Sequence, residues 1–294
     1  MRLISYHDAD GRASLGLAAG DGWLPATELL PDGPRTMAGL LDLGPTGLSA
    51  LRAVADPHRL THGRAMADVT LHAPVPRPGK VIAIGRNYRE HAAEEGTDVP
   101  AAPLIFSKWP SCVVGPDEPI RWDPTLTDQV DYEAELAVII GRTARRVSVD
   151  RALEYVLGYT CLDDVSARDL QFGDGQWTRG KSLDTFCPMG PALVTADEIP
   201  DPQDLAISCR VDGALRQDAN TSQMYFTVAE IISHCSQAFT LEPGDVIATG
   251  TPAGVGIFRD PPRFLRDGEE VVVEIERIGR LRNVCRAEAG VAIA

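Results

Sequence analysis

Two glutamates separated by one residue, Glu133 and Glu135, are the side chains in this chain with the clearest potential for chemistry. They lie near the start of segment 131–141, whose apolar second half is typical of a buried β-strand. Because side chains alternate between the two faces of a strand, both carboxylates are expected on the same face. Two like charges at this spacing are costly unless a positive charge lies between them. The pair therefore predicts a bound divalent cation.

A second acidic pair, Asp163 and Asp164, follows the apolar stretch 155–161. This pattern is typical of a strand that ends at a site, and either aspartate could supply a third carboxylate. An all-oxygen set of ligands without histidine or cysteine favours Mg²⁺ or Mn²⁺ over zinc. Each piece also has an ordinary explanation: the glutamate pair as a solvated strand face, the aspartates as a turn or cap, and Arg168 with Asp169 as a salt bridge.

The elements that must position these acids are mostly strands. Segment 81–85 is predicted to be a short buried strand, and a helical pattern with charged residues follows over 89–95. Two further helices are predicted over 149–156 and 227–238. Other strands are predicted over 104–106, 193–195, 206–211, 245–248 and 270–275. Because helices and strands do not alternate regularly, the pattern favours an α+β or all-β core over a doubly wound parallel sheet.

The first 72 residues have the features of a separate small unit. Short strand patterns over 2–6, 14–18 and 23–25 are interrupted by Asp-Gly and Gly-Asp-Gly turns, and two weak helical patterns follow over 36–43 and 48–55. Segment 71–80, rich in proline and glycine, is predicted to be the linker. We therefore predict a small N-terminal α/β domain over 1–72, with a structural or dimer-supporting role, and a catalytic domain over 73–294.

Composition limits the classes of partner. The chain has 294 residues, 44% hydrophobic and 24% charged, which is ordinary for a globular protein. Its net charge of -14 repels phosphate backbones, so we expect no nucleic-acid partner. The six cysteines form no Cys-x-x-Cys pair, which favours reduced thiols. The chain begins without an apolar signal segment and has no 18-residue apolar run, so we expect a cytoplasmic protein without membrane association.

Several longer motifs in a fixed order surround these acids. They are Ile84-Gly85-Arg86-Asn87-Tyr88 with His91 and Glu94, Asp131-Tyr132-Glu133-Ala134-Glu135-Leu136, Asp164-Val165-Ser166-Ala167-Arg168-Asp169-Leu170-Gln171, Gly180-Lys181-Ser182-Leu183-Asp184-Thr185-Phe186, Pro243-Gly244-Asp245-Val246-Ile247 and Thr249-Gly250-Thr251-Pro252. Over about residues 73–285, the chain resembles the fumarylacetoacetate hydrolase family in its short, prokaryotic-type form, similar to acylpyruvate and fumarylpyruvate hydrolases. The resemblance implies a mixed β-sandwich roll that is usually homodimeric.

The resemblance also implies roles for individual residues. The three metal-binding carboxylates of the family match Glu133, Glu135 and Asp164, which selects Asp164 over Asp163. The catalytic residues implied are His91, Glu94 and Lys181. Gln171 and Thr251 match substrate-contacting positions of the family, and we also predict substrate-binding roles for Arg86, Tyr88 and Arg168. The bound ion is expected to be Mg²⁺ or Mn²⁺.

The physical chemistry of these residues agrees with such roles. A divalent ion would chelate a 2-oxo or 1,3-dicarbonyl acid and stabilise an enolate, and Lys181 would add positive charge beside the oxyanion. His91 and Glu94 lie three apart on the predicted helix and so share a face, although Glu95 is also within reach of the histidine. Arg86 replaces an apolar residue of many family members; it either binds a substrate carboxylate or forms a salt bridge with the lid. The glycines at 85 and 96 are candidate hinges for that segment, or ordinary turns.

The leading expectation for function is a hydrolase that cleaves the C–C bond of an acylpyruvate or fumarylpyruvate-type β-diketo acid. The alternative is an isomerase or decarboxylase of a 2-oxo or 2-hydroxymuconate-type acid, including oxaloacetate, on the same metal site. A catalytically silent binding paralogue is a remote third reading. The sequence lacks the extra upstream aspartate of the long, eukaryotic-type enzymes, which argues against the fumarylacetoacetase of tyrosine breakdown.

Overall fold

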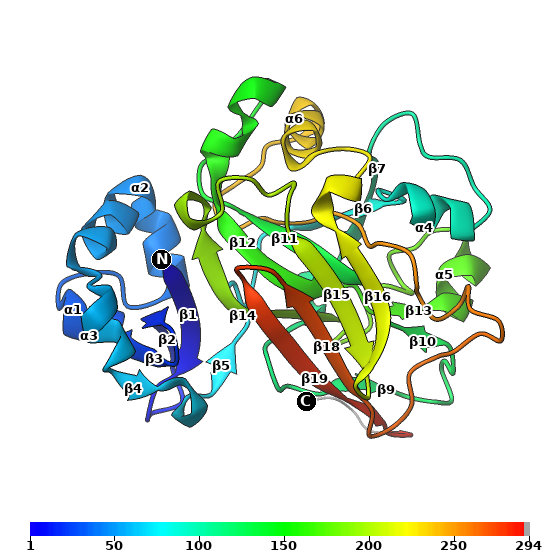
Figure 1. The fold of residues 1–294 in the computed structure, drawn as a ribbon, viewed down its shortest axis with the longest axis horizontal. Coiled ribbons are helices and arrows are strands. Elements are labelled where there is room, and N and C mark those ends of the chain that lie inside the picture. The colour runs from blue at the N-terminus through cyan, green and yellow to red at the C-terminus, as the bar shows by residue number, and fades with distance from the viewer. Residues whose placement is uncertain (291–294) are drawn as a thin grey trace.

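A large mixed sheet runs through the centre of the computed structural model, which describes residues 1–290 (Figure 1). The strands follow the order β4-β3-β2-β1-β14-β12-β11-β17-β6-β7, with β5 beside β1 and β8 beside β14. The strands are β1 (Arg2–His7), β2 (Ala13–Ala19), β3 (Gly22–Pro25), β4 (Arg64–Ala65), β5 (Leu71–His72), β6 (Val81–Gly85), β7 (Leu104–Lys108), β8 (Val113–Val114), β11 (Ala134–Ile140), β12 (Val156–Asp163), β14 (Cys187–Thr195) and β17 (Val246–Ala248). The fold is therefore rich in strands, as the sequence predicts.

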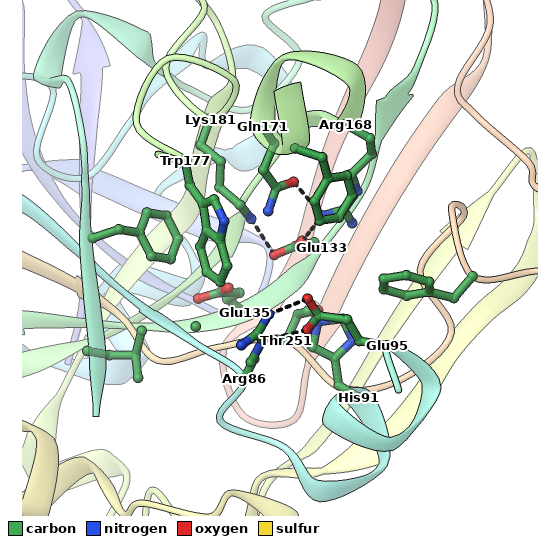
Figure 2. Close-up of a pocket in the computed structure, with 15 residues that line it drawn as sticks. Arg86, His91, Glu95, Glu133, Glu135, Arg168, Gln171, Trp177, Lys181 and Thr251 are labelled. Atoms are coloured by element: carbon green, nitrogen blue, oxygen red, sulfur yellow. Dashed lines mark hydrogen bonds and ion pairs between the residues drawn. The ribbon is translucent and has the colours of Figure 1, made fainter. Parts of the chain in front are cut away.

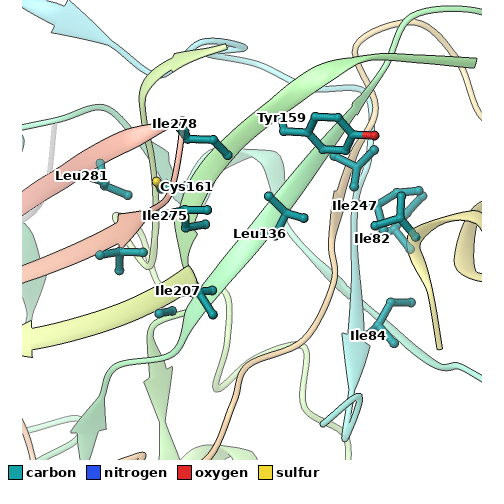
Figure 3. Packing of buried hydrophobic residues seen from close by; sticks show 14 of the residues in the cluster. Ile82, Ile84, Leu136, Tyr159, Cys161, Ile207, Ile247, Ile275, Ile278 and Leu281 are labelled. Atoms are coloured by element: carbon teal, nitrogen blue, oxygen red, sulfur yellow. The ribbon is translucent and has the colours of Figure 1, made fainter. Parts of the chain in front are cut away.

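A second, five-stranded sheet packs against one face of the large sheet. Its order is β16-β15-β18-β19-β9, and β10 pairs with β13 in a separate two-stranded sheet. The strands are β9 (Ile120–Trp122), β10 (Val130–Asp131), β13 (Ser166–Ala167), β15 (Ala206–Val211), β16 (Ala214–Asn220), β18 (Glu270–Ile275) and β19 (Gly279–Ala287). Leu136 of β11 packs with Ile207 and Ile275 of the second sheet in one buried cluster (Figure 3). The two sheets thus form a sandwich with a continuous apolar core.

Strand β11 is buried on both faces, which explains its apolar sequence. Leu136 and Val138 belong to the core between the sheets, whereas Ala137 and Ile139 belong to a second cluster on the other face. That second cluster includes Leu40 of the N-terminal region. The alternation expected for a strand is therefore present, with an apolar partner layer on each side.

The N-terminal strands continue the large sheet. Strand β1 pairs with β14 through Leu3 and Leu193, and the N-terminal helices cover part of the sheet's second face (Figure 1). These helices are α1 (Ala26–Leu29), α2 (Met37–Val54) and α3 (Pro57–Thr61). Helix α2 is interrupted at Gly44, where φ is +56°, so its two halves correspond to the two helical patterns predicted over 36–43 and 48–55. The division into domains at residue 72 stays a prediction.

Three further α-helices lie in the described part of the chain. They are α4 (Arg89–Glu94), α5 (Arg168–Asp174) and α6 (Val228–Ala238). A capping box starts α6, because the Thr227 hydroxyl accepts from the Glu230 N–H while the Glu230 carboxylate accepts from the Thr227 N–H. The helix predicted over 149–156 is present as a 3₁₀ helix over Val149–Tyr155, and Val156 already begins the long strand β12. Within residues 1–290, no helix is long and apolar enough to cross a membrane.

Candidate active site

The three predicted metal ligands meet at one end of the strand pair β11 and β12. Oxygen atoms of Glu133, Glu135 and Asp164 all lie within 4.8 Å of one another, and all three residues are buried. Glu135 belongs to β11, while Glu133 directly precedes that strand and Asp164 directly follows β12. The continuous strand expected over 131–141 is in fact divided, because Asp131 pairs with Ser166 in the small sheet. The two glutamates nevertheless converge as predicted.

Strand alternation explains why Asp164, and not Asp163, joins the glutamates. Leu162 lies opposite Glu135 in the register and belongs to the cluster on the second face of the sheet. Asp163, one residue further, lies opposite Ala134, which belongs to the core between the sheets. The Asp163 carboxylate accepts from the Glu133 N–H at 2.8 Å, and burial raises its pKa to about 8. Asp163 therefore holds the backbone of Glu133 from behind the site.

Buried cations occupy part of the space between the acids (Figure 2). The Lys181 ammonium donates to Glu133 at 2.8 Å and to Asp164 at 2.7 Å. Lys108, whose side chain is fully buried, donates to the other oxygen of Asp164 at 2.6 Å and also to the carbonyl of Lys181. The sequence predicts a role for Lys181 beside the carboxylates. It does not predict that Lys108 contacts Asp164, because no acidic residue lies near Lys108 in β7. Lys108 is thus a residue that only the fold reveals.

Arg168 binds the carboxylate oxygen of Glu133 that Lys181 does not contact. Its guanidinium donates to Glu133 Oε1 at 2.6 Å and to Asp131 Oδ2 at 2.9 Å. Asp131 in turn accepts from the N–H groups of Gly256 and Ile257. The expected substrate-binding role of Arg168 stays a prediction, and in this structure its Nε and Nη1 donate to protein groups, among them the Gln171 side-chain oxygen at 3.0 Å.

The pKa values of the two glutamates are shifted in opposite directions. Burial alone would raise the pKa of Glu133, but Lys181, Arg168 and His91 outweigh it and lower this pKa to about 2. Burial raises the pKa of Glu135 well above its usual range, and the neighbouring Asp164 and Glu133 carboxylates raise it further. Glu135 accepts one hydrogen bond, from the Gly250 N–H at 2.8 Å, and among the described residues it has no cationic partner.

The site therefore fits a divalent cation. A buried carboxylate that lacks a positive partner faces two others, and the donor set is all oxygen, as Mg²⁺ and Mn²⁺ prefer. Glu133, Glu135 and Asp164 would hold the ion. The identity of the ion is part of the proposal below.

His91 and Glu94 form the expected pair on α4. The His91 Nδ1–H donates to Glu94 Oε1 at 2.8 Å, and the Gly254 N–H donates to the same carboxylate at 3.0 Å. His91 is buried and lines the pocket beside Glu133 and Glu135. The alternative partner, Glu95, instead binds Arg86. This arrangement fixes the imidazole and directs Nε2 away from Glu94.

The pocket above the acids contains most of the predicted substrate-binding residues. Its lining includes Ile84, Gly85, Arg86, His91, Glu95, Phe106, Glu133, Glu135, Arg168, Gln171, Phe172, Trp177, Lys181, Thr251 and Phe258. Tyr88 does not line this pocket; it is buried in the core between the sheets, and its hydroxyl has no hydrogen-bond partner among the described residues. The expected contact of Tyr88 with substrate stays a prediction.

Thr251 is held by a residue that the sequence does not reveal. Gln217 of β16 is buried; its side-chain nitrogen donates to the Thr251 hydroxyl at 2.8 Å, and its oxygen accepts from the Ala134 N–H at 2.9 Å. The Thr251 hydroxyl donates to the Ala134 carbonyl at 3.0 Å. This network links the start of β11 to the loop after β17, so it positions Thr251 beside the carboxylates.

A metal-dependent change in stability follows from this geometry. With Mn²⁺ or Mg²⁺ at about 100 times its Kd, we expect the free energy of unfolding to rise by about 2.7 kcal/mol, because the ion binds the folded state alone. Thermal melts with and without the ion measure the change, and a chelator should reverse it. Melting temperatures that neither ion changes would contradict a cation site at Glu133, Glu135 and Asp164.

Comparison with known proteins agrees with the geometry. The chain is 44% identical to the mitochondrial oxaloacetate tautomerase FAHD2B of Bos taurus over 288 residues, which covers 96% of this chain and 91% of that protein. It is 47% identical to the oxaloacetate tautomerase YisK of Bacillus subtilis (strain 168) over 222 residues, 74% of each chain. The structure of a fumarylacetoacetate hydrolase from the psychrophile Exiguobacterium antarcticum superimposes with a TM-score of 0.85 and 41% identity, covering 98% of this chain and 100% of the other.

The family match covers the whole candidate site. Residues 80–286 match the family described as Fumarylacetoacetate (FAA) hydrolase C-terminal, which is more than half of the chain. The matched segment contains His91, the three clustered carboxylates and Lys181. The chain therefore belongs to the fumarylacetoacetate hydrolase family.

Proposed function

We propose that this protein is a Mg²⁺- or Mn²⁺-dependent keto–enol tautomerase of a 2-oxo dicarboxylic acid of the oxaloacetate type. The observation that carries the proposal is the similarity, at 44% and 47% identity, to relatives named oxaloacetate tautomerase. This similarity reverses the order expected from the sequence, where C–C bond hydrolysis stands first and an isomerase that includes oxaloacetate among its substrates stands second.

The site residues can perform the proton transfers of this reaction. When bound, the cation would supply Lewis-acid polarisation of the 2-oxo group and so stabilise the enolate. In ketonisation the enol oxygen loses a proton and carbon 3 gains one. His91 is the candidate proton carrier, because Glu94 accepts from Nδ1 and leaves Nε2 free to accept or donate a proton on the pocket side.

Other residues would position the substrate. Lys181 lines the pocket and adds positive charge where the enolate oxygen develops. Gln171 and Thr251 line the same pocket and would present polar atoms to the substrate. Trp177 and Phe258 add apolar walls, which limit the access of water.

The direct test is the decay of the enol form of oxaloacetate, followed by its ultraviolet absorbance. With Mn²⁺, we expect the protein to accelerate ketonisation far above the spontaneous rate, and a chelator should remove the acceleration. A rate equal to the uncatalysed one with both Mg²⁺ and Mn²⁺ would overturn the proposed function.

Replacement of His91 by alanine tests the proton carrier. We expect kcat for ketonisation to fall by about 10²- to 10⁴-fold while the affinity for Mn²⁺ is retained. His62→Ala, at the exposed residue that directly follows α3, serves as the matched control and should keep the parent rate. If His91→Ala ketonises oxaloacetate at the parent rate, another group transfers the proton.

Hydrolysis of an acylpyruvate is the second candidate. The His91–Glu94 pair favours it, since a histidine held by a carboxylate can take a proton from an attacking water. The solved structure at 41% identity carries the name fumarylacetoacetate hydrolase. Acetylpyruvate and fumarylpyruvate, assayed beside oxaloacetate for tautomerisation and for decarboxylation, separate these activities. Turnover of none of them would favour the silent paralogue.

We propose a homodimer as the functional unit, as the family resemblance implies. Light scattering at several concentrations gives the molar mass directly, and a mass near 31.6 kDa would contradict the dimer. A cytoplasmic location stays a prediction, and the mammalian relatives are named as mitochondrial proteins.

A further inference from the structure

We propose that Glu95 acts as an internal substitute for the distal carboxylate of the substrate, and that a 2-oxo dicarboxylate displaces it from Arg86. This exchange would make Arg86 and Glu95 the pair that selects dicarboxylates over monocarboxylates. The inference rests on the proposed function for the substrate class, and it adds residues that set specificity at the same site.

The geometry of the Arg86–Glu95 pair is that of a bound carboxylate. Arg86 Nε donates to Glu95 Oε2 and Nη2 donates to Oε1, both at 2.7 Å (Figure 2). This two-point arrangement is the one by which arginine recognises the carboxylate of a ligand. Both residues line the pocket that also contains Glu133, Glu135 and Lys181. A dicarboxylate chelated at the acids would therefore meet a guanidinium already arranged for its second carboxylate.

The fold fixes Arg86 and not Glu95. Arg86 has φ of +56°, which is uncommon for a residue other than glycine, and the next residue, Asn87, is anchored through its side chain to Thr249 and Phe226. The guanidinium also lies over the Trp177 ring, 5.6 Å from its centroid. A Cβ at position 85 would come within 2.5 Å of that ring, so glycine there lets Trp177 approach.

Glu95 is held far less firmly than its neighbour Glu94. The Glu94 carboxylate accepts from both His91 and Gly254, whereas every hydrogen bond of the Glu95 carboxylate among the described residues comes from Arg86. Glu95 is the C-cap residue that directly follows α4, and Gly96 comes next with φ of +71° and open space around it. The carboxylate of Glu95 can therefore turn toward solvent without breaking another contact.

These facts give the exchange a physical basis. The Arg86 side chain is only 27% exposed, so its guanidinium would lose part of its hydration without gaining a partner, and Glu95 supplies that partner while the pocket lacks substrate. A ligand with one carboxylate leaves the pair intact, whereas a ligand with a second carboxylate competes with Glu95 for the same donors. Removal of the competitor should then strengthen the binding of dicarboxylates alone.

The test measures binding and needs no turnover. L-malate and L-lactate share a 2-hydroxy acid and differ by the distal carboxylate, and calorimetry with Mn²⁺-loaded protein gives a Kd for each. We expect the parent protein to bind malate about tenfold more tightly than lactate. In Glu95→Gln this ratio should rise about tenfold further, and in Arg86→Gln it should fall to nearly one.

The double variant Arg86→Gln with Glu95→Gln isolates the coupling. If Glu95 acts through Arg86, Glu95→Gln should leave the malate-to-lactate ratio unchanged once Arg86 is replaced. Equal Mn²⁺ affinities in all four proteins verify that the site is intact. If the salt bridge is purely structural, Glu95→Gln should instead weaken the binding of malate and of lactate by the same factor, and this result would overturn the inference. A parent protein that binds malate no more tightly than lactate would overturn it as well. Failure of the tautomerase assay alone would leave these binding ratios unaffected.

Discussion

Replacing Glu135 with glutamine is expected to weaken Mn²⁺ binding by at least about 10²-fold and to lower kcat/KM for ketonisation by about 10³-fold, or roughly 4 kcal/mol. Of the three clustered carboxylates, Glu135 is the one without a cation within ion-pair distance among the described residues, so a bound ion would supply the positive charge that it lacks. Glutamine keeps an acceptor for the Gly250 N–H, so the fold should persist. Calorimetric titration with Mn²⁺ and steady-state kinetics measure the two effects.

Asp163→Asn is the matched control for this variant. Asp163 is also a buried carboxylate, and it is the sequence neighbour of Asp164. Its side chain lies on the other face of the sheet, where it accepts a hydrogen bond from the Glu133 N–H. Asparagine can accept the same hydrogen bond, so Mn²⁺ affinity should remain within a few-fold of the parent value. If Asp163→Asn lost the metal while Glu135→Gln kept it, the assignment of the ligands would be wrong.

Replacing Lys108 with methionine is expected to reduce the free energy of unfolding by about 3–5 kcal/mol, because one member of a buried ionic network is removed. Asp164 would lose a donor at 2.6 Å, and the carbonyl groups of Val165 and Lys181 would lose theirs. Urea denaturation of the metal-free protein measures the change.

An exposed ion pair provides the comparison. Arg52 and Asp197 form a salt bridge at 2.7 Å in which both side chains are nearly half exposed, so Arg52→Met should cost less than about 1 kcal/mol. A similar, small loss for Lys108→Met would mean that Lys108 is not needed to hold Asp164 in place.

The sequence predicts the cluster of three carboxylates because most of the information for it is local. A two-residue period places Glu133 and Glu135 together, and the ordered motifs add Asp164. The same alternation, applied across β12, also separates Asp163 from the site, because Leu162 and Asp163 point to opposite faces. These conclusions need only the strand period and the pairing of two neighbouring strands.

The parts that sequence reasoning misses depend on distant contacts. Lys108 reaches Asp164 across 56 positions, and Gln217 reaches Thr251 from a strand whose other residues are at least partly exposed. Strand β16 has the sequence ALRQDAN, which has too little apolar alternation to predict a strand. For the segment over 149–156, the helical pattern is correct up to Tyr155, and only its end differs, because Val156 is the first residue of β12.

The buried lysines and arginine have a consequence for how the protein acquires its metal. Lys108, Arg168 and Lys181 balance most of the charge on Asp131, Glu133 and Asp164, so these side chains can keep their positions before any ion arrives. Small zinc domains, by contrast, remain unfolded until they are loaded. On the proposed function, synthesis and metal loading would therefore be separate events, and protein that is already folded would respond to the supply of Mg²⁺ or Mn²⁺.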